Sequence, residues 1–188
     1  MKAKNQVETN LKSFIFYEPF NQIITRMDDE TAGKFALRIC KFMFEGELDK
    51  SDMDESEDFV FTAIEDMLIN SKVRQQSGRE QRGYKSKFKH FTFYELYYKA
   101  MKILSLEDSG KFVKSLWKYL FDNEKPCFES SELNYYFSLC EDKLDLSKKR
   151  QTARKKNSRS MAISRLTALN DNKNNSVIGV DYSLEEAK

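Results

Sequence analysis

Apolar residues near the start of the chain recur with the period of an amphipathic helix. Five of them share one stripe, at the spacing i, i+4, i+7, i+8 and i+11: Phe16, Phe20, Ile23, Ile24 and Met27. Pro19 is compatible with a helix here because N–H groups in the first turn have no hydrogen-bond acceptor within the helix, so the missing N–H of proline costs nothing. The pattern therefore predicts a first helix over about residues 17–27.

Two further helices are predicted to follow. Asp28 is a good N-cap, with Asp29 and Glu30 in the first turn, where acids are favoured, and the helix that it opens is expected to end near Gly46. A third helix begins near Glu55, after an acidic loop. Its buried stripe consists of Val60, Phe61, Ile64, Met67 and Leu68. Residues 13–80 are thus predicted to form a three-helix unit.

The same pattern then occurs a second time. The segment Phe14-Ile15-Phe16-Tyr17-Glu18 returns 77 positions later as Phe91-Thr92-Phe93-Tyr94-Glu95. Other matches at this offset are Glu30, Gly33, Lys34 and Phe35 with Glu107, Gly110, Lys111 and Phe112. One residue is then dropped in a loop, and Ser71, Lys72, Arg74 and Gln75 recur at offset 76 as Ser147, Lys148, Arg150 and Gln151. Such a self-match indicates a duplicated structural unit, with repeat 1 over residues 13–80 and repeat 2 over residues 90–160.

We predict an all-α fold in which the two three-helix repeats pack as a pseudo-two-fold six-helix bundle. The 188 residues include only 6 Gly and 2 Pro, too few for the tight turns of an all-β fold. Each repeat alone has a size at which burial is marginal, so the two copies are expected to share one core. Gly33 and Gly110 interrupt the second helix of each copy, which indicates close approach of another helix. Residues 161–188 lose the apolar period and are expected to form a mostly disordered tail.

Charge is segregated along the chain, although the net charge is only +2. From Glu45 to Asp66 there are ten acidic residues and one lysine, whereas from Lys148 to Arg165 there are eight basic residues and no acid. Both third helices end in basic residues, and we predict that these ends bind nucleic acid or an acidic protein surface. The candidate binding residues are Lys72, Arg74, Arg79, Arg82, Lys148, Lys149, Arg150, Arg154, Lys155, Lys156 and Arg159.

Two interpretations of these basic ends are open. Lys and Arg complement the negative C-terminal end of a helix dipole, so a solvated helix end would carry them as well. That interpretation fits repeat 1 as well as binding does, whereas the basic run of repeat 2 is denser than a dipole requires. No stacking aromatic residues are interleaved in the run, so base readout has no support. The exit sequence Ser-Lys-x-Arg-Gln persists in both copies, and the sequence suggests no packing role for it.

No pattern in the chain indicates catalysis, a cofactor or a metal site. The single histidine, His90, has no nucleophile at a recognisable spacing, and Walker, dinucleotide-binding and HExxH motifs are absent. Cys40, Cys127 and Cys140 show no C-x-x-C pairing, and the acidic loop lacks a calcium-binding pattern. No apolar run reaches membrane-spanning length, and the first residues contain no apolar signal segment. We therefore expect a cytoplasmic, non-enzymatic protein without membrane contact.

The order of these motifs resembles a known family. Each repeat has an aromatic-Tyr segment, a helix, an Asp or Ser cap, Glu-x-x-Gly-Lys-Phe, and a third helix that leaves on a Lys/Arg run. This order resembles a family of short helical proteins carried by phages and prophages, often encoded near replication genes. The resemblance spans about residues 13–80 and 90–160 and rests on Glu30-Thr31-Ala32-Gly33-Lys34-Phe35 and Glu107-Asp108-Ser109-Gly110-Lys111-Phe112. It implies a role in phage or mobile-element DNA metabolism and brings no established activity or catalytic residue.

Our leading hypothesis is a non-enzymatic accessory protein that binds nucleic acid, with DNA favoured over RNA, through the basic helix-three ends. The alternative is a protein-interaction adaptor or inhibitor that acts on a host or phage replication or defence protein. In that case an acidic surface of the partner would meet the same basic residues. The sequence leaves the oligomeric state open beyond the internal pseudo-dimer.

Overall fold

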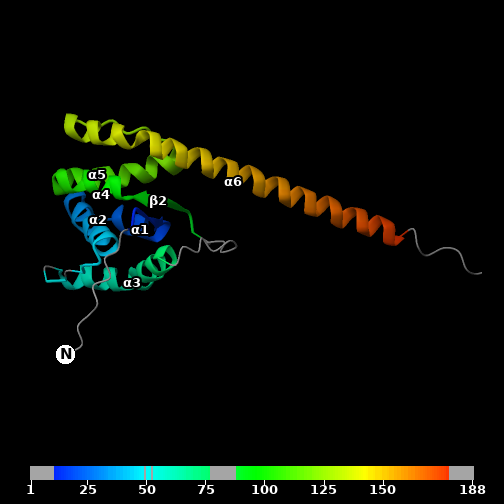
Figure 1. The fold of residues 1–188 in the computed structure, drawn as a ribbon, viewed down its shortest axis with the longest axis horizontal. Coiled ribbons are helices and arrows are strands. Elements are labelled where there is room, and N and C mark those ends of the chain that lie inside the picture. The colour runs from blue at the N-terminus through cyan, green and yellow to red at the C-terminus, as the bar shows by residue number, and fades with distance from the viewer. Residues whose placement is uncertain (1–10, 49, 52, 77–87, 178–188) are drawn as a thin grey trace, which may run out of the picture. The chain divides into compact units, whose positions relative to one another are not determined.

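Two short β-strands join the two repeats (Figure 1). The computed structural model describes residues 11–48, 50–51, 53–76 and 88–177. Strand β1 (Ser13–Tyr17) runs antiparallel to β2 (His90–Tyr94). The helices of the described ranges are, in chain order, α1 (Glu18–Ile24), α2 (Asp29–Phe44), α3 (Glu55–Gln76), α4 (Glu95–Ile103), α5 (Leu106–Trp117), the π-helical turn η1 (Lys118–Asp122) and α6 (Ser131–Val177).

The fold is mostly helical, as the apolar stripes predicted, and the small sheet corrects the expectation of an all-α fold. The predicted N-cap is confirmed, because the Asp28 carboxylate accepts a hydrogen bond from the Thr31 N–H at 2.9 Å. Ser105 caps α5 in the same way, accepting from the Asp108 N–H at 3.1 Å. The chain leaves α2 through Gly46, whose φ of 77° lies in the left-handed region that glycine adopts without strain.

The strand register shows that the duplication is a structural two-fold. Ile15 pairs with Thr92, and these residues are equivalent in the two repeats, so the pseudo-two-fold axis passes between them. The flanking pairs are Phe14 with Phe93 and Phe16 with Phe91. Ring centroids within these two pairs lie 5.1 and 5.2 Å apart, and all four side chains are buried. The phenylalanine alternation therefore places four rings on one face of the sheet, at the centre of the shared core.

The second helices of the two repeats cross at their glycines. A Cβ atom on Gly33 of α2 would overlap the backbone carbonyl of Leu106, and one on Gly110 of α5 would overlap the carbonyl of Asp29. Asp29 and Leu106 are themselves equivalent positions, so the contact is reciprocal, as a two-fold requires. The close approach predicted from the two glycines is confirmed. The approaching helix is the other repeat's copy of the same helix.

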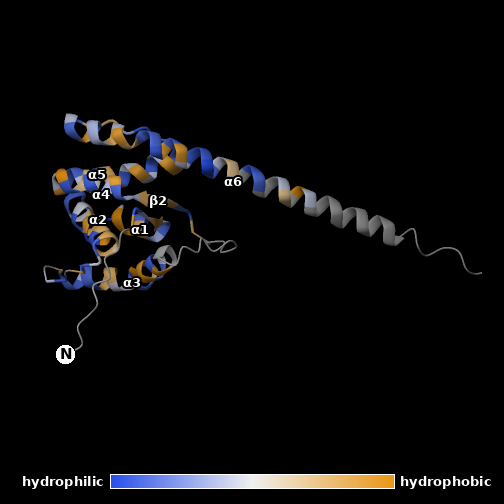
Figure 2. Cartoon of the chain, viewed as in Figure 1, coloured by the Kyte–Doolittle hydropathy of each residue, from blue (hydrophilic) through white to orange (hydrophobic). Residues whose placement is uncertain are grey.

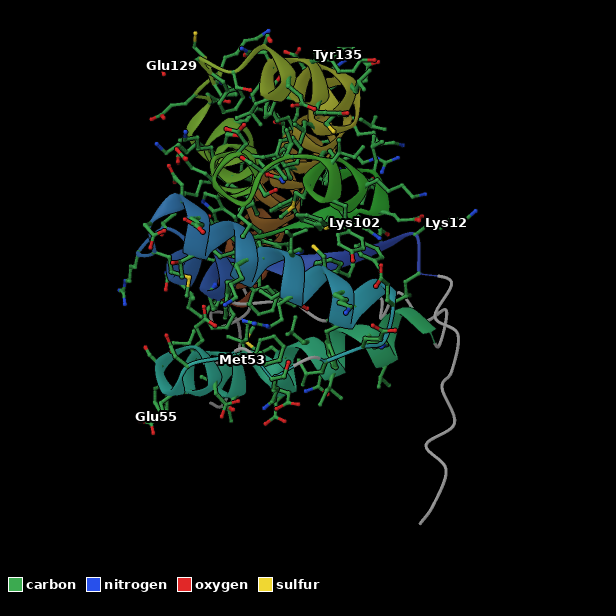
Figure 3. The ribbon with its side chains drawn as sticks, turned by 90° about the vertical axis from the view of Figure 1, so that its left-hand side faces the viewer. Lys12, Met53, Glu55, Lys102, Glu129 and Tyr135 are labelled. Carbon is green, nitrogen blue, oxygen red and sulfur yellow. The ribbon has the colours of Figure 1, made fainter. Side chains whose placement is uncertain are left out.

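The third helices lie on opposite outer sides of the residue 11–147 body. In Figure 1, α3 lies beside α2, and the first turns of α6 lie beside α5. Figure 3 shows Met53 and Glu55, near the start of α3, at the opposite end of the view from Glu129 and Tyr135, near the start of α6. Each repeat therefore adds its third helix to its own second helix.

The contacts of second and third helices are equivalent in the two repeats. The rings of Phe35 and Phe61 meet edge to face in repeat 1, with centroids 6.1 Å apart and planes at 73°. Their counterparts Phe112 and Phe137 meet at 6.1 Å and 78° in repeat 2. Residues that match at the sequence offsets of 77 and 76 therefore also occupy equivalent positions in the fold.

Tyr97 of α4 is fully buried, and its hydroxyl group has no hydrogen-bond partner among the described residues. Repeat 1 carries Phe20 at the equivalent position. A buried polar group without a partner gives up hydration at a cost of about 1–3 kcal/mol. We expect Tyr97→Phe to raise the free energy of unfolding by about 1 kcal/mol, measured by urea denaturation, and the reverse change Phe20→Tyr to lower it. A Tyr97→Phe variant that is less stable than the wild type would show that the hydroxyl group makes a stabilising hydrogen bond.

The chain divides into two compact units, with the boundary inside α6 between Ser147 and Lys148. A mostly disordered tail was expected from residue 161, whereas α6 continues to Val177 and residues 178–188 lie outside the described ones. An apolar period reports packing rather than helix formation, and residues 148–177 contain no Gly or Pro that would end a helix. Within the described ranges, no helix combines the length and the apolar character needed to cross a membrane.

Candidate nucleic-acid interface

The exit sequence of each third helix begins with a serine that packs inside the fold. Ser71 is 2% exposed and Ser147 is 9% exposed, and the Ser147 hydroxyl donates to the carbonyl of Lys143 at 2.9 Å. Larger side chains at these positions would meet closely packed neighbours. Part of the motif shared by both copies therefore serves packing, a role that the sequence did not indicate.

Lys72, the next residue in repeat 1, is engaged within its own repeat. Its ammonium group donates to the carbonyl of Phe42 at 3.0 Å and lies 5.0 Å from the centroid of the Phe42 ring. Phe42 belongs to the last turn of α2, where carbonyl groups lack intrahelical partners, so Lys72 caps that helix from α3. Burial lowers the pKa of Lys72. These contacts assign the side chain a structural role.

The other candidates divide between α3, α6 and residues outside the described ranges. Arg74 lies in the last turns of α3, and Arg79 and Arg82 lie outside the described residues. All the repeat 2 candidates lie on α6 after Ser147: Lys148, Lys149, Arg150, Arg154, Lys155, Lys156 and Arg159. Of these, Lys149, Arg150 and Lys156 are exposed and Lys148 is half-buried. The coloured part of α6 after Ser147 is mainly hydrophilic in Figure 2.

This basic section of α6, from Lys148 to Arg165, has a high linear charge density. Its eight basic residues and absence of acids extend over about 27 Å of helix at about 1.5 Å per residue. One positive charge every ~3.4 Å is about half the density of phosphate charge along duplex DNA, which is one per ~1.7 Å. Neutralising phosphates releases condensed counterions, so such a helix favours polyphosphate binding without base contacts.

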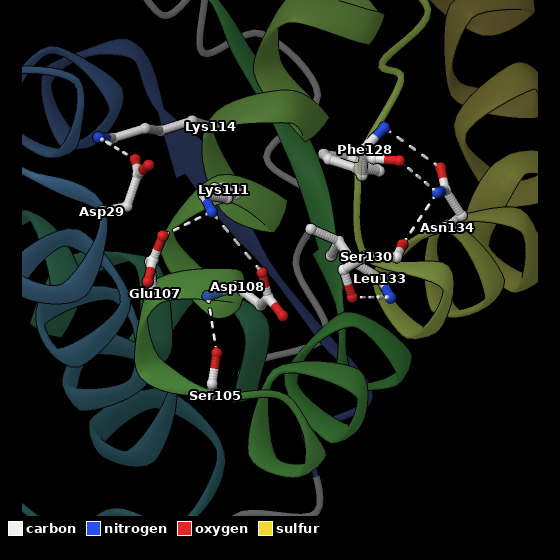
Figure 4. Close-up of polar contacts among 10 residues, drawn as sticks. All are labelled: Asp29, Ser105, Glu107, Asp108, Lys111, Lys114, Phe128, Ser130, Leu133 and Asn134. Atoms are coloured by element: carbon white, nitrogen blue, oxygen red, sulfur yellow. Dashed lines mark hydrogen bonds and ion pairs between the residues drawn. The ribbon is translucent and has the colours of Figure 1, made fainter.

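A cleft of about 830 Å³ opens beside α5 and was not predicted from the sequence. It lies between α5 and the segment of residues 123–130 that leads into α6 (Figure 4). The amide group of Asn134 donates to the carbonyls of Phe128 and Ser130 at 2.7 and 2.9 Å. These bonds hold the segment against the first turn of α6 and keep one wall of the cleft in place.

The histidine and the buried cysteines have structural surroundings. His90 lies on β2 with its Nδ1 atom 3.1 Å from the carbonyl oxygen of Phe88. Cys40 and Cys140 are buried, and burial raises the pKa of Cys140 to about 12, so this thiol packs as a small apolar group. In the described part of the chain, no group of three or more His, Cys, Asp or Glu residues is placed to hold a metal ion.

The chain belongs to a class of helical proteins in which two tandem repeats pack as a pseudo-dimer. The pairing of β1 with β2 and the reciprocal contact at Gly33 and Gly110 define this class, and α6 adds a basic helix to it. A family of unknown function (DUF6291) matches the chain twice, over residues 13–88 and 90–168. These matches cover more than half of the chain, which therefore belongs to this family, and they confirm the tandem duplication. Comparison with the curated proteins and with the solved structures finds no match.

Proposed function

We propose that this chain binds nucleic acid, with DNA favoured over RNA, through the basic section of α6. The observation that carries the proposal is a helix with eight basic residues and no acid between Lys148 and Arg165. In our proposal the protein acts as a non-enzymatic accessory factor in phage or mobile-element DNA metabolism. The resemblance of its repeats to phage proteins encoded near replication genes supports this role and the preference for DNA.

The binding that we propose is to phosphates, without reading of base sequence. Lysine and arginine form charge-assisted hydrogen bonds with phosphate oxygens. The section from Lys148 to Arg165 contains no aromatic residue that would stack on a base. Repeat 1 contributes less in this proposal, because the ammonium group of Lys72 already caps α2. Affinity should therefore depend steeply on salt and weakly on sequence.

Removing charge from α6 is the test of this proposal. The variant replaces five residues with alanine: Lys148, Lys149, Arg150, Arg154 and Lys155. We expect affinity for a labelled DNA duplex at about 50 mM salt to fall about 100-fold or more. The slope of the logarithm of the binding constant against the logarithm of the salt concentration should fall in magnitude by about 1 for each phosphate that is no longer neutralised. Fluorescence anisotropy across a salt series measures both. A wild-type protein that leaves DNA and RNA unbound at about 50 mM salt would refute the proposal.

A matched control removes the same number of positive charges from residues 11–147. Its five alanines replace exposed lysines: Lys12, Lys50, Lys89, Lys99 and Lys118. Because none of these lysines belongs to the basic section of α6 and salt screens the interactions of exposed charges, we expect affinity to change by less than about threefold. Equal losses in the two variants would mean that net charge, rather than α6, carries the binding.

A further inference from the structure

Repeat 1 contains a buried ion pair between its second and third helices. The Arg38 Nη1 atom lies 3.1 Å from Glu57 Oε2, and the two side chains are only 7% and 11% exposed. Lys34 Nζ lies 3.9 Å from the same carboxylate oxygen. An arginine and a glutamate of the chain itself therefore fill the space between α2 and the start of α3.

Repeat 2 lacks both members of this pair. The positions equivalent to Arg38 and Glu57 are Ser115 and Leu133. The equivalent ring contacts of the two repeats fix this correspondence in space. Ser115 and Leu133 both line the cleft beside α5. The cleft is therefore bordered by the two residues that stand in place of the arginine and glutamate of repeat 1.

Most of the lysines that line the cleft are already neutralised. Three of them each have a carboxylate within 2.8 Å, in the pairs Lys111–Glu107 at 2.6 Å, Lys114–Asp29 at 2.8 Å and Lys125–Glu141 at 2.8 Å. Figure 4 shows the first two of these contacts on α5. Glu107 and Glu141 do not line the cleft. They neutralise the charge of Lys111 and Lys125 from outside it and take up no space within it.

The carboxylates that line the cleft are less well paired. Asp108 lies 4.0 Å from Lys111, and Glu124 lies 3.9 Å from Lys118. Glu129 has no ion pair among the described residues. Exposed pairs at such distances contribute little. The cleft therefore retains three weakly paired carboxylates against one weakly paired ammonium group, a balance that favours a cationic ligand.

Apolar surface in the cleft suits the stem and the plane of an arginine. The half-buried ring of Phe128 and the half-buried Pro126 form part of the wall, and Leu133 is fully buried behind it. Arginine packs its methylene chain along apolar surface and stacks its planar guanidinium on aromatic rings. An ammonium ion is more strongly hydrated and lacks the planar face.

We infer that the cleft receives an arginine side chain of a partner protein, in the place that Arg38 occupies in repeat 1. The methylene chain lies against Pro126, the guanidinium stacks on Phe128, and Asp108 and Glu129 neutralise its charge. Ser115 and Leu133, which replace Arg38 and Glu57, border this cleft. This site lies within residues 11–147 and is separate from the basic section of α6 that we propose for nucleic acid.

The test titrates the full chain with N-acetyl-arginine amide and follows by NMR the backbone amide signals of residues 124, 125 and 127–130, which flank Pro126. N-acetyl-citrulline amide is the control probe, because it has nearly the same shape without the charge. We expect saturable shifts with the arginine probe and about fivefold weaker binding of the citrulline probe, the size of effect that one or two exposed ion pairs supply. Equal binding of the two probes, or no saturable shift with arginine, would overturn the inference.

Two variants locate the binding. Ser115→Arg with Leu133→Glu installs the ion pair of repeat 1 and fills the cleft, so the arginine probe should no longer shift the signals. Asp108→Asn with Glu129→Gln removes two carboxylates at sites that are not buried, and we expect about fivefold weaker binding in a folded protein. Undiminished binding in the second variant would contradict the inference even if the first variant failed to fold.

Discussion

Alanine at Gly110 is expected to lower the free energy of unfolding by at least about 3 kcal/mol, the upper end of ordinary overpacking costs. The added methyl group would overlap the backbone carbonyl of Asp29, which cannot turn aside as a flexible side chain could. Helices α2 and α5 would have to separate, and the core that they share with the strands would lose its packing. At about 2–4 °C per kcal/mol for a chain of this size, Tm should fall by about 6–12 °C.

Gly33→Ala is expected to cost a similar amount, because the crossing is reciprocal and the clash is again with backbone. Gly46→Ala serves as the matched control. Gly46 has a φ of 77° at the exposed end of α2, where alanine costs about 1–2 kcal/mol because its Cβ disfavours the left-handed conformation. Urea denaturation followed by circular dichroism compares the three variants. A Gly110→Ala protein within about 1 kcal/mol of the wild type would show that the two helices can move apart freely.

Local signals in the sequence predicted the helices and their ends. The caps at Asp28 and Ser105 each join residues three positions apart, so the capping pattern is visible in a short stretch of sequence. The strands were missed because each has five residues and pairs with a segment far along the chain. Phe16 and Phe20 also fit a helical stripe, and nothing local distinguished the two interpretations.

The candidate sites depended on contacts that no short stretch reveals. Lys72 meets Phe42 across 30 positions, so its helix-capping role becomes visible only in the fold. The cleft did have a signal in the sequence. The internal alignment sets Arg38 against Ser115 and Glu57 against Leu133. A positive and a negative residue that are replaced together in the other copy of a duplicated unit indicate two positions that are in contact, as Arg38 and Glu57 are.

Leucine in place of Glu57, the residue that repeat 2 has at this position, is expected to lower the free energy of unfolding by about 3–5 kcal/mol. The change takes the carboxylate away from a guanidinium that is only 7% exposed. It also takes away the carboxylate that lies 3.9 Å from the Lys34 ammonium group. Arg38→Ser should cost less, because Lys34 still faces Glu57 in that variant.

The double variant Arg38→Ser with Glu57→Leu gives repeat 1 the pair of residues found in repeat 2. It is expected to be about 1–3 kcal/mol more stable than Glu57→Leu alone, since the buried guanidinium is removed together with the carboxylate that it contacts. Urea denaturation of the wild type, the two single variants and the double variant measures this coupling. If the losses of the single variants add up in the double variant, the two side chains are not coupled. The replacement of both residues in repeat 2 would then be two independent differences between the repeats rather than the exchange of one ion pair.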